Sequence, residues 1–379
     1  MNKFNILIGL FFLLLFGCSR DTKFSGLIDY GELNLIDIQI EMEIGQSSEY
    51  VPGNLGYLMV FSDMTMLVAD WGKMTIEQFS AEGKHMATIA KEGRGPGELG
   101  EIFSLHKGVN DTLKVRYLGM SQQIDFFSRG EDPIYRLSKS WIPERVKERR
   151  MLTIAPRSET EYYARESWSN HQLRSKIASG AEYGWVPVTI VDTYENVLVD
   201  SLYTLKTPIP VARMSSGGAM TILGWPPYQY SDQFRVMDNN RYVIARPDSS
   251  ALLIYTQKHE FERKISLHVE ERIVEKTDTD FLFNLGGVSD EVRRELEARI
   301  PEFKPIFINI WVSENYFWLH VDTTEEGKQV VVFTMEGEIM GTLFLSKHDE
   351  IQFANDKQIY TIHKDPDEGH TIRSYQVKL

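Results

Sequence analysis

The chain has 379 residues and carries a formal net charge of −13 at pH 7. An acidic chain without a basic block repels phosphate backbones, which argues against nucleic acid as a partner. Charged residues make up 25% and aromatic residues 12% of the sequence, as is typical of a folded globular protein. The single cysteine excludes an intrachain disulfide. The length exceeds that of an average domain, but single all-β domains reach this size.

Residues 1–17 have the layout of a signal peptide, in which a lysine precedes an apolar run at 6–16 that is too short to span a bilayer comfortably. The sequence Leu-Phe-Gly-Cys at 15–18 resembles the lipobox of bacterial lipoproteins. In that family the cysteine is acylated and becomes the first mature residue. The resemblance implies lipidation of Cys18 and a lipid-anchored tether at 18–32. A plain cleaved signal and an unprocessed apolar N-terminus are the alternatives.

The residue after the cysteine bears on location. In lipoproteins, an aspartate directly after the lipidated cysteine opposes export to the outer membrane. This chain has Ser19 at that position, so by resemblance to the sorting rules it is expected to reach the outer membrane. We therefore expect a cell-envelope protein bound to the outer membrane through its lipid. Whether it faces the periplasm or the exterior stays open.

A strand-turn-strand unit recurs along the chain. The short apolar run Thr65–Ala69 predicts a buried strand, and 75–79 and 85–90 predict two more, joined by a turn at Gly83. The second hairpin of this unit, 76–89, aligns without a gap on 330–343, and a weaker copy lies at 252–265. Internal repeats of a β-meander indicate stacked or radially arranged units.

Two segments flank the first unit. Residues 33–44 alternate apolar and polar side chains, which predicts a half-buried strand, and its position suggests that it closes the last unit. Residues 92–101 are rich in glycine but lack the Gly-Lys-Ser/Thr ending of a phosphate-binding loop, and Pro96 removes a donor. A connector between two β-units is the favoured interpretation.

The motif Gly-Arg-Gly-Pro-Gly-Glu-Leu at 93–99, directly after such a unit, resembles the six-bladed β-propeller lipoproteins of Bacteroidetes, relatives of NHL-repeat propellers. The resemblance implies an all-β, six-bladed β-propeller over 33–379, and a structural role for the motif between blades. Residues 33–44 would complete the last blade and close the ring.

Three segments interrupt the repeat. Residues 141–150 are basic and predict a short helix or loop, and 208–232 form a long insertion rich in glycine and proline. A helical insertion is expected at about 270–305, with one clear helix that begins after Ser289 and stops at Pro301. Insertions of this kind lie over one end of a propeller and vary among relatives.

The sequence contains no common catalytic motif and no dinucleotide fingerprint. Two acidic segments, at 278–280 and 365–369, lack the six ligands of a calcium loop and predict solvated turns. His320 and His363 lie on strand patterns, and we interpret both as packed histidines more readily than as metal ligands. No catalytic residue, metal ligand or cofactor is therefore predicted.

One loop suggests binding. Trp225, Tyr228 and Tyr230 surround a rigid Pro-Pro pair and could stack on a sugar ring or grip a partner. The alternative is that these rings plug the insertion onto the propeller. The leading hypothesis is a non-catalytic scaffold that binds a small molecule, glycan, peptide or protein at the loop-rich end of the central funnel. The competing hypothesis is a hydrolase or lactonase similar to metal-dependent six-bladed propellers, with Ca²⁺ on the axis.

Overall fold

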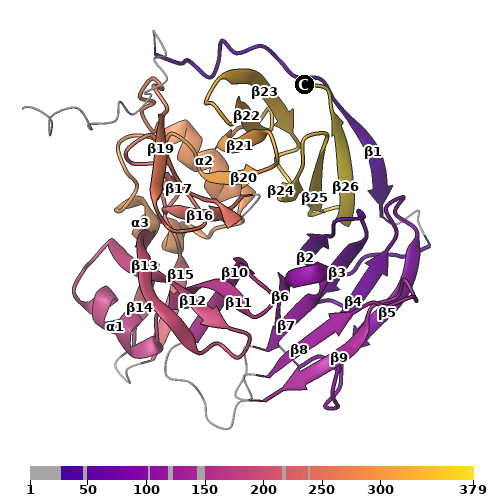
Figure 1. Cartoon of the computed structure of the whole chain (residues 1–379). Helices are drawn as coiled ribbons and strands as arrows, with labels where there is room; N and C mark the ends of the chain where they lie inside the picture. Colours follow the sequence, from indigo (N-terminus) through magenta and orange to yellow (C-terminus); the bar gives the residue numbers. More distant parts are fainter. Residues whose placement is uncertain are drawn as a thin grey trace, which may run out of the picture.

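The computed structural model describes residues 27–45, 49–100, 103–117, 123–142, 150–215, 219–237 and 240–379. Within them, six antiparallel four-stranded sheets stand around a common axis as the blades of a β-propeller (Figure 1). The first strand of each blade contacts the first strands of both neighbours, so these six strands form a complete inner ring. The predicted all-β, six-bladed architecture is confirmed. No helix within these ranges is long and apolar enough to cross a membrane.

The blades follow one another along the chain. Blade 1 contains β2 (Leu55–Val60), β3 (Met66–Asp70), β4 (Thr75–Phe79) and β5 (His85–Lys91), and blade 2 contains β6 (Phe103–Lys107), β7 (Leu113–Tyr117), β8 (Ile124–Ser128) and β9 (Arg136–Trp141). Blade 3 contains β10 (Arg150–Pro156), β11 (Glu161–Ser167), β12 (Tyr183–Asp192) and β13 (Val197–Pro208), and blade 4 contains β16 (Gln233–Val236), β17 (Tyr242–Arg246), β18 (Ala251–Tyr255) and β19 (Phe261–Ser266). Blade 5 contains β20 (Asn309–Val312), β21 (Tyr316–Thr323), β22 (Lys328–Thr334) and β23 (Ile339–Leu345), and blade 6 contains β24 (Asp349–Ala354), β25 (Gln358–Asp365) and β26 (Gly369–Val377).

The ring is closed by a strand from the other end of the chain. Strand β1 (Ile38–Ile44) is the outer strand of blade 6 and pairs antiparallel with β26, from Ile38 opposite Val377 to Ile44 opposite Ile372. The alternating pattern that predicted this strand reflects its position, since an outer strand is covered on one side only. The segment before it is also packed: Ile28 and Tyr30 are buried, and the Ile28 N–H donates to the carbonyl of His268. The predicted closing strand is therefore confirmed, but it begins at Ile38 and not at residue 33.

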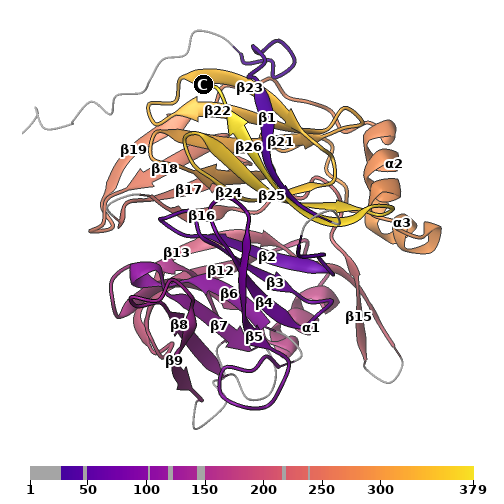
Figure 2. The ribbon, with the colours of Figure 1, turned by 90° about the vertical axis from the view of Figure 1, so that its right-hand side faces the viewer.

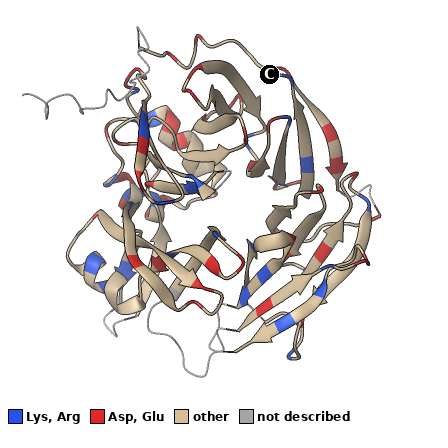
Figure 3. Ribbon diagram, in the orientation of Figure 1, with Lys and Arg blue, Asp and Glu red and all other residues tan. Residues whose placement is uncertain are grey.

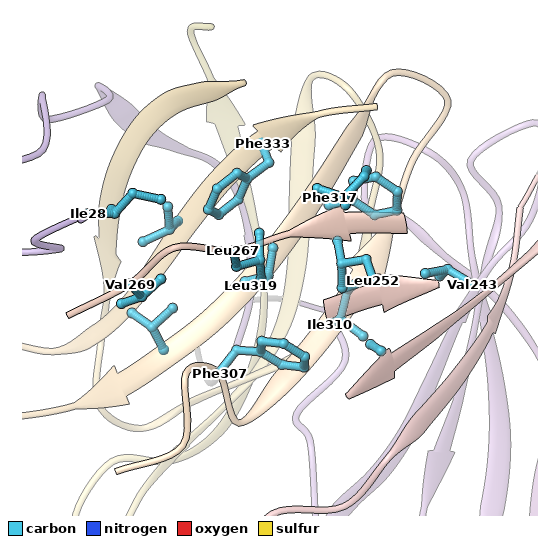
Figure 4. Packing of buried hydrophobic residues seen from close by; sticks show 14 of the residues in the cluster. Ile28, Val243, Leu252, Leu267, Val269, Phe307, Ile310, Phe317, Leu319 and Phe333 are labelled. Atoms are coloured by element: carbon cyan, nitrogen blue, oxygen red, sulfur yellow. The ribbon is translucent and has the colours of Figure 1, made fainter. Parts of the chain in front are cut away.

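The core lies between the blades. The second and third strands of each blade are covered by neighbours on both faces, so all five residues of β3 are buried, and all but Asp70 at its end are apolar. The contact between blades 4 and 5 is built from Val243, Leu252, Leu267, Ile310, Phe317, Leu319 and Phe333, with Phe307 beside them (Figure 4). Each such side chain stabilises the fold by about 1.5–3 kcal/mol through burial.

Three helices and one hairpin are inserted between strands. The hairpin of β14 (Val211–Met214) and β15 (Met220–Gly224) leaves between blades 3 and 4, and α2 (Lys276–Leu285) and α3 (Asp290–Glu297) between blades 4 and 5 (Figure 2). They pack together through Val211, Phe283 and Leu296. We call this unit the cap.

The helical insertion differs in detail from expectation. The expected helix is α3, which follows Ser289, but α2 and α1 (Asn170–Ala178) are additional helices. A capping box formed by Glu275 and Asp278 starts α2, and another formed by Ser169 and Gln172 starts α1. Of the expected helix or loop at 141–150, residues 143–149 lie outside the described residues; Trp141 ends β9 and Arg150 begins β10.

Candidate functional site

The inner strands of four blades enclose a cavity on the propeller axis. It has a volume of about 310 Å³ and is lined by Ile154, Arg235, Val236, Trp311, Val312, Gln352, Phe353 and Ala354. These residues come from β10, β16, β20 and β24, the first strands of blades 3 to 6. We call this space the axial cavity. Its volume is at the lower end of the range of small-molecule sites.

The axial cavity continues into a wider space. A second hollow of about 700 Å³ shares Val236, Val312, Phe353 and Ala354 with it and is rimmed by polar residues within two positions of the ends of inner strands, among them Ser62, Ser313 and Asn355. The wide end thus lies where the inner strands end. The cap is inserted just before β16 and β20 begin, so it lies over the opposite end.

Arg235 is held rigidly in the wall of the axial cavity. Its Nε donates to the carbonyl of Ile310 at 2.9 Å, and one terminal nitrogen donates to the side-chain oxygens of Gln233 and Asn309 at 2.8 and 2.9 Å. The acceptors are neutral groups of blades 4 and 5. Burial, with a smaller contribution from the charge of Arg165, lowers the pKa of Arg235 to about 10, so the guanidinium remains charged at neutral pH.

Aromatic faces line the same space. Trp311 and Phe353 are half-buried, and the indole N–H of Trp311 has no hydrogen bond to a described residue. Gln352 Nε2 has only a long contact of 3.5 Å to the Glu350 carbonyl. Flat rings beside donors that the protein does not use are the usual contents of a site that binds and orients a polar organic molecule.

The three aromatic residues of the predicted loop lie at three separate places. Trp225 is 58% exposed to solvent. Tyr228 is buried, and its hydroxyl lies 3.4 Å from Asp322 Oδ1. Tyr230 stacks on Tyr183 with ring centroids 5.4 Å apart. None of the three lines the axial cavity.

Tyr228 belongs to the contact that fixes the cap to blade 5. Lys304 Nζ lies 2.8 Å from Asp278 Oδ1 in α2 and 2.9 Å from Asp322 Oδ2 in β21, and Arg272 adds a bond of 3.1 Å to Asp322. Burial first, and then the charge of Asp322, raise the pKa of Tyr228 well above its usual range. The Tyr228 ring thus has the plugging role that the sequence left as an alternative.

Asp322 is one of several carboxylates that pair with a tyrosine. Each of these aspartates is buried or nearly so, and the hydroxyl supplies one of the hydrogen bonds that a buried carboxylate requires. The pairs are Tyr50–Asp70 at 2.6 Å, Tyr117–Asp125 at 3.0 Å, Tyr228–Asp322 at 3.4 Å and Tyr375–Asp349 at 2.7 Å. We interpret the pairs as structural, because two of them link strands of one blade, Tyr117–Asp125 and Tyr375–Asp349, and the other two tie a segment outside the blades to a strand.

The two histidines are packed. His320 is buried, and its Nε2 lies 2.9 Å from the Asp322 carbonyl. Burial, with a smaller effect of Lys328, lowers the pKa of His320 to about 3. His363 Nδ1 lies 2.9 Å from Asp349 Oδ1. Among the described residues, no group of three His, Cys, Asp or Glu side chains is placed to hold a metal ion.

Backbone amides of the glycine-rich connector are hydrogen-bonded to carboxylates of the same chain. Glu98 Oε2 accepts hydrogen bonds from the N–H groups of Arg94 and Gly95 at 2.8 and 2.7 Å, and the Gly97 N–H donates to Asp125 at 3.1 Å. A loop whose amides already bind carboxylates of the chain does not offer them to a phosphate. The segment joins β5 to β6, as the connector interpretation requires.

A further groove lies between α2 and the connections of blades 5 and 6. It has a volume of about 720 Å³, and α2 contributes one face of the helix, including Phe281 and Leu285. Lys347 and His348 lie on the other side, with the Lys347 ammonium 5.7 Å from the centre of the Phe281 ring. The groove mixes charges of both signs, so its lining favours no single chemical class of ligand.

Sequence reasoning missed the residues of the axial cavity. Trp311, Arg235 and Phe353 are far apart in the sequence and carry no motif. The one available signal is their position in the first strand of a repeat unit, since the inner strand of a propeller blade borders the axis.

The chain was compared with known proteins. No protein-family model and no curated protein matches it. Many solved structures match the chain, among them three that are similar to it over most of its length. A candidate exported protein of Bacteroides fragilis is 9% identical, with a TM-score of 0.49, over 91% of this chain and 96% of that chain. A member of the DUF4221 family from Bacteroides vulgatus is 10% identical, with a TM-score of 0.46, over 91% and 99%. Virginiamycin B lyase from Staphylococcus aureus is 8% identical, with a TM-score of 0.45, over 90% and 99%. Identities and scores this low carry no conclusion about what this chain does.

Proposed function

We propose that this protein is a lipid-anchored protein of the cell envelope whose propeller binds a ligand in the axial cavity and does no chemistry on it. The anchor is Cys18, as the resemblance to a lipobox implies, and the membrane is the outer membrane, as Ser19 implies by resemblance to the sorting rules; both residues lie outside the described ones. The ligand is a small molecule or the end of a glycan or peptide, because the cavity is too small for a folded partner.

The observation that carries this proposal is the lining of the axial cavity. Trp311 and Phe353 offer apolar faces, while Arg235 is fixed by neutral acceptors and keeps its charge. Side chains held in this way need little reorganisation when a ligand binds, which lowers the entropic cost of association.

The test is a thermal-shift screen of glycans, peptides and small acids against the soluble chain that begins at Ser19, in three forms: wild type, Trp311→Ala and Trp225→Ala. A ligand at a hundredfold excess over its Kd adds about 2.7 kcal/mol to the stability of the folded state, which moves the melting midpoint by a few degrees. We expect hits that Trp311→Ala abolishes and Trp225→Ala keeps.

The opposite pattern would move the site to the exposed loop. Hits that need Trp225 and not Trp311 would contradict the axial cavity as the binding site and favour the aromatic loop instead. Both variants remove one indole, but Trp225 is more exposed than Trp311, so the two substitutions are expected to differ in their effect on stability. The melting midpoints without ligand measure that difference.

A further inference from the structure

Arg165, in the second strand of blade 3, has no counter-charge in the structure. Its guanidinium makes no hydrogen bond or ion pair with any described residue. It is accessible to solvent, yet enough protein surrounds it for burial to lower the pKa of Arg165. Solvent accessibility and a pKa lowered by burial are both expected for a side chain that points into a water-filled space surrounded by protein.

The strand register places Arg165 on the side of the axial cavity. Arg165 lies opposite Val188 of β12 and two residues from Tyr163, and both of these residues belong to the buried cluster against which Ile154, which lines the cavity, packs. Residues two apart in a strand share a face. Arg165 is also close enough to Arg235 for its charge to act on that residue.

Two arginines thus act on one space, and no ion pair with a carboxylate of the described residues compensates them. Arg235 has only neutral acceptors, and neither residue has an ion pair to a described carboxylate. The chain as a whole has 54 Asp and Glu against 41 Lys and Arg, and its charges of both signs are spread over the blades (Figure 3).

We propose that the axial cavity is selective for organic anions, with Arg165 as the residue that recognises the anionic group of the ligand. The ligand class is a carboxylate, sulfonate or phosphate ester on a body that carries a ring. Its negative charge offsets part or all of the charge of the two guanidiniums, and its ring contacts Trp311 and Phe353. This inference rests on the proposed function, since it names the ligand class of the same cavity.

The test uses two fluorescent probes that differ in one group. Anilinonaphthalene sulfonate carries the anion, and phenylnaphthylamine has the same rings without it. Both are titrated into the soluble chain from Ser19 as wild type, Arg165→Gln, Arg165→Lys and Trp311→Ala. The matched control is Arg136→Gln, which removes an exposed arginine paired with Asp132 on the outside of blade 2.

We expect Arg165→Gln to weaken binding of the sulfonate probe about tenfold or more, because a charged hydrogen bond is lost in a partly enclosed site. Arg165→Lys keeps most of the affinity, and Arg136→Gln keeps all of it. Binding of the neutral probe changes less than about twofold in the Arg165 variants, since no charged bond is involved. Sulfate alone does not displace either probe at equal concentration.

The outcomes separate the two proposals. If Trp311→Ala weakens both probes while Arg165→Gln weakens neither, the cavity binds ligands and the preference for anions is wrong. If Trp311→Ala changes neither probe, the axial cavity is not the site and both proposals fail. A second measurement, the melting midpoint without ligand, does not depend on any probe. Arg165→Gln is expected to raise this midpoint, because it removes an uncompensated charge from the folded state. A lowered midpoint would contradict the absence of a partner for Arg165.

Discussion

Lys304 Nζ lies 2.9 Å from Asp322 Oδ2, and both side chains are almost fully buried. The same ammonium lies 2.8 Å from Asp278, so one lysine joins helix α2 of the cap to strand β21 of blade 5. A buried pair of this kind adds little when complete, but it is costly to break, because the remaining charge stays buried without a partner.

Asp322→Asn is therefore expected to destabilise the protein by about 2–3 kcal/mol, at the lower end of the cost of breaking a buried pair because Arg272 is partly exposed. Urea unfolding of the variant measures the loss. Asp367→Asn, at an exposed position in the β25–β26 turn, is the control and should change stability by less than about 0.5 kcal/mol. Equal stability of both variants would mean that the cap is held by its apolar contacts alone.

Stability should fall when the solution is acidified below neutral pH. His320 has a folded-state pKa of about 3, set first by burial, and an unfolded-state pKa of about 6.5. Between these values the unfolded chain binds more protons, so the free energy of unfolding decreases as the pH falls from about 6.5 toward 3. The loss from this residue between pH 7 and pH 5 is about 1–2 kcal/mol.

The measurement is urea unfolding at pH 7 and pH 5 for the wild type, His320→Gln and His171→Gln. His320→Gln should show a smaller difference between the two pH values, while His171→Gln, exposed on α1, should keep the wild-type difference. An unchanged difference in His320→Gln would mean that the histidine is not held in its neutral form.

Gly341 in β23 should tolerate no side chain. Its φ is +149°, and a Cβ atom there would lie 2.5 Å from the carbonyl oxygen of Asn34, in the segment that leads to β1. Gly341→Ala is expected to cost about 1–3 kcal/mol in thermal or urea unfolding. Gly130→Ala, in an exposed turn with open space around it, is the matched control and should be neutral. A neutral Gly341→Ala would show that residues 34–36 move away easily.

The effect of calcium on thermal stability distinguishes the binding proposal from the hydrolase alternative. Ligand binding in the axial cavity needs no metal, so the melting midpoint of the metal-stripped soluble chain is expected to stay constant when Ca²⁺ is added. A rise of several degrees would favour a metal-dependent propeller enzyme and direct attention to carboxylates near the axis. The same titration with Mg²⁺ controls for ionic strength.

Lipidation is tested by labelling. When cells that express the full chain are grown with a palmitate analogue, the wild-type protein should become labelled. The Cys18→Ser variant should carry no label and should no longer be found in the membrane fraction. Persistent labelling of Cys18→Ser would contradict the anchor. Ser19→Asp tests the sorting rule separately, since it should keep the label and change the membrane in which the protein is found.

The architecture could be predicted because it repeats. The hairpins around Phe79 and Phe333 carry the same pattern, and β1 alternates polar and apolar side chains as an outer strand does. Helix α2 was missed because its threonines and aspartates are poor helix formers, and its stability comes from a capping box and from the burial of Phe283.

The axial cavity could not be predicted in the same way. Arg235 and Trp311 come together only because the ring closes, and neither position differs from an ordinary strand position in the local sequence. The aromatic loop, by contrast, has a conspicuous composition. Its rings nevertheless have separate surroundings, because Tyr228 packs at Asp322 and Tyr230 stacks on Tyr183.

The pairing of β1 with β26 also sets an order of events in the making of the protein. Ile38 leaves the ribosome early, but its partner Val377 follows more than three hundred residues later. The wide separation costs little at equilibrium, since loop-closure entropy grows only with the logarithm of length, yet β1 cannot pair until β26 has been synthesised, after all the other strands. A premature stop before Ile372 therefore removes more than the last few residues, because every partner of β1 lies between Ile372 and Val377. It leaves β1 without its partner and turns a closed ring into an open one with two exposed edges.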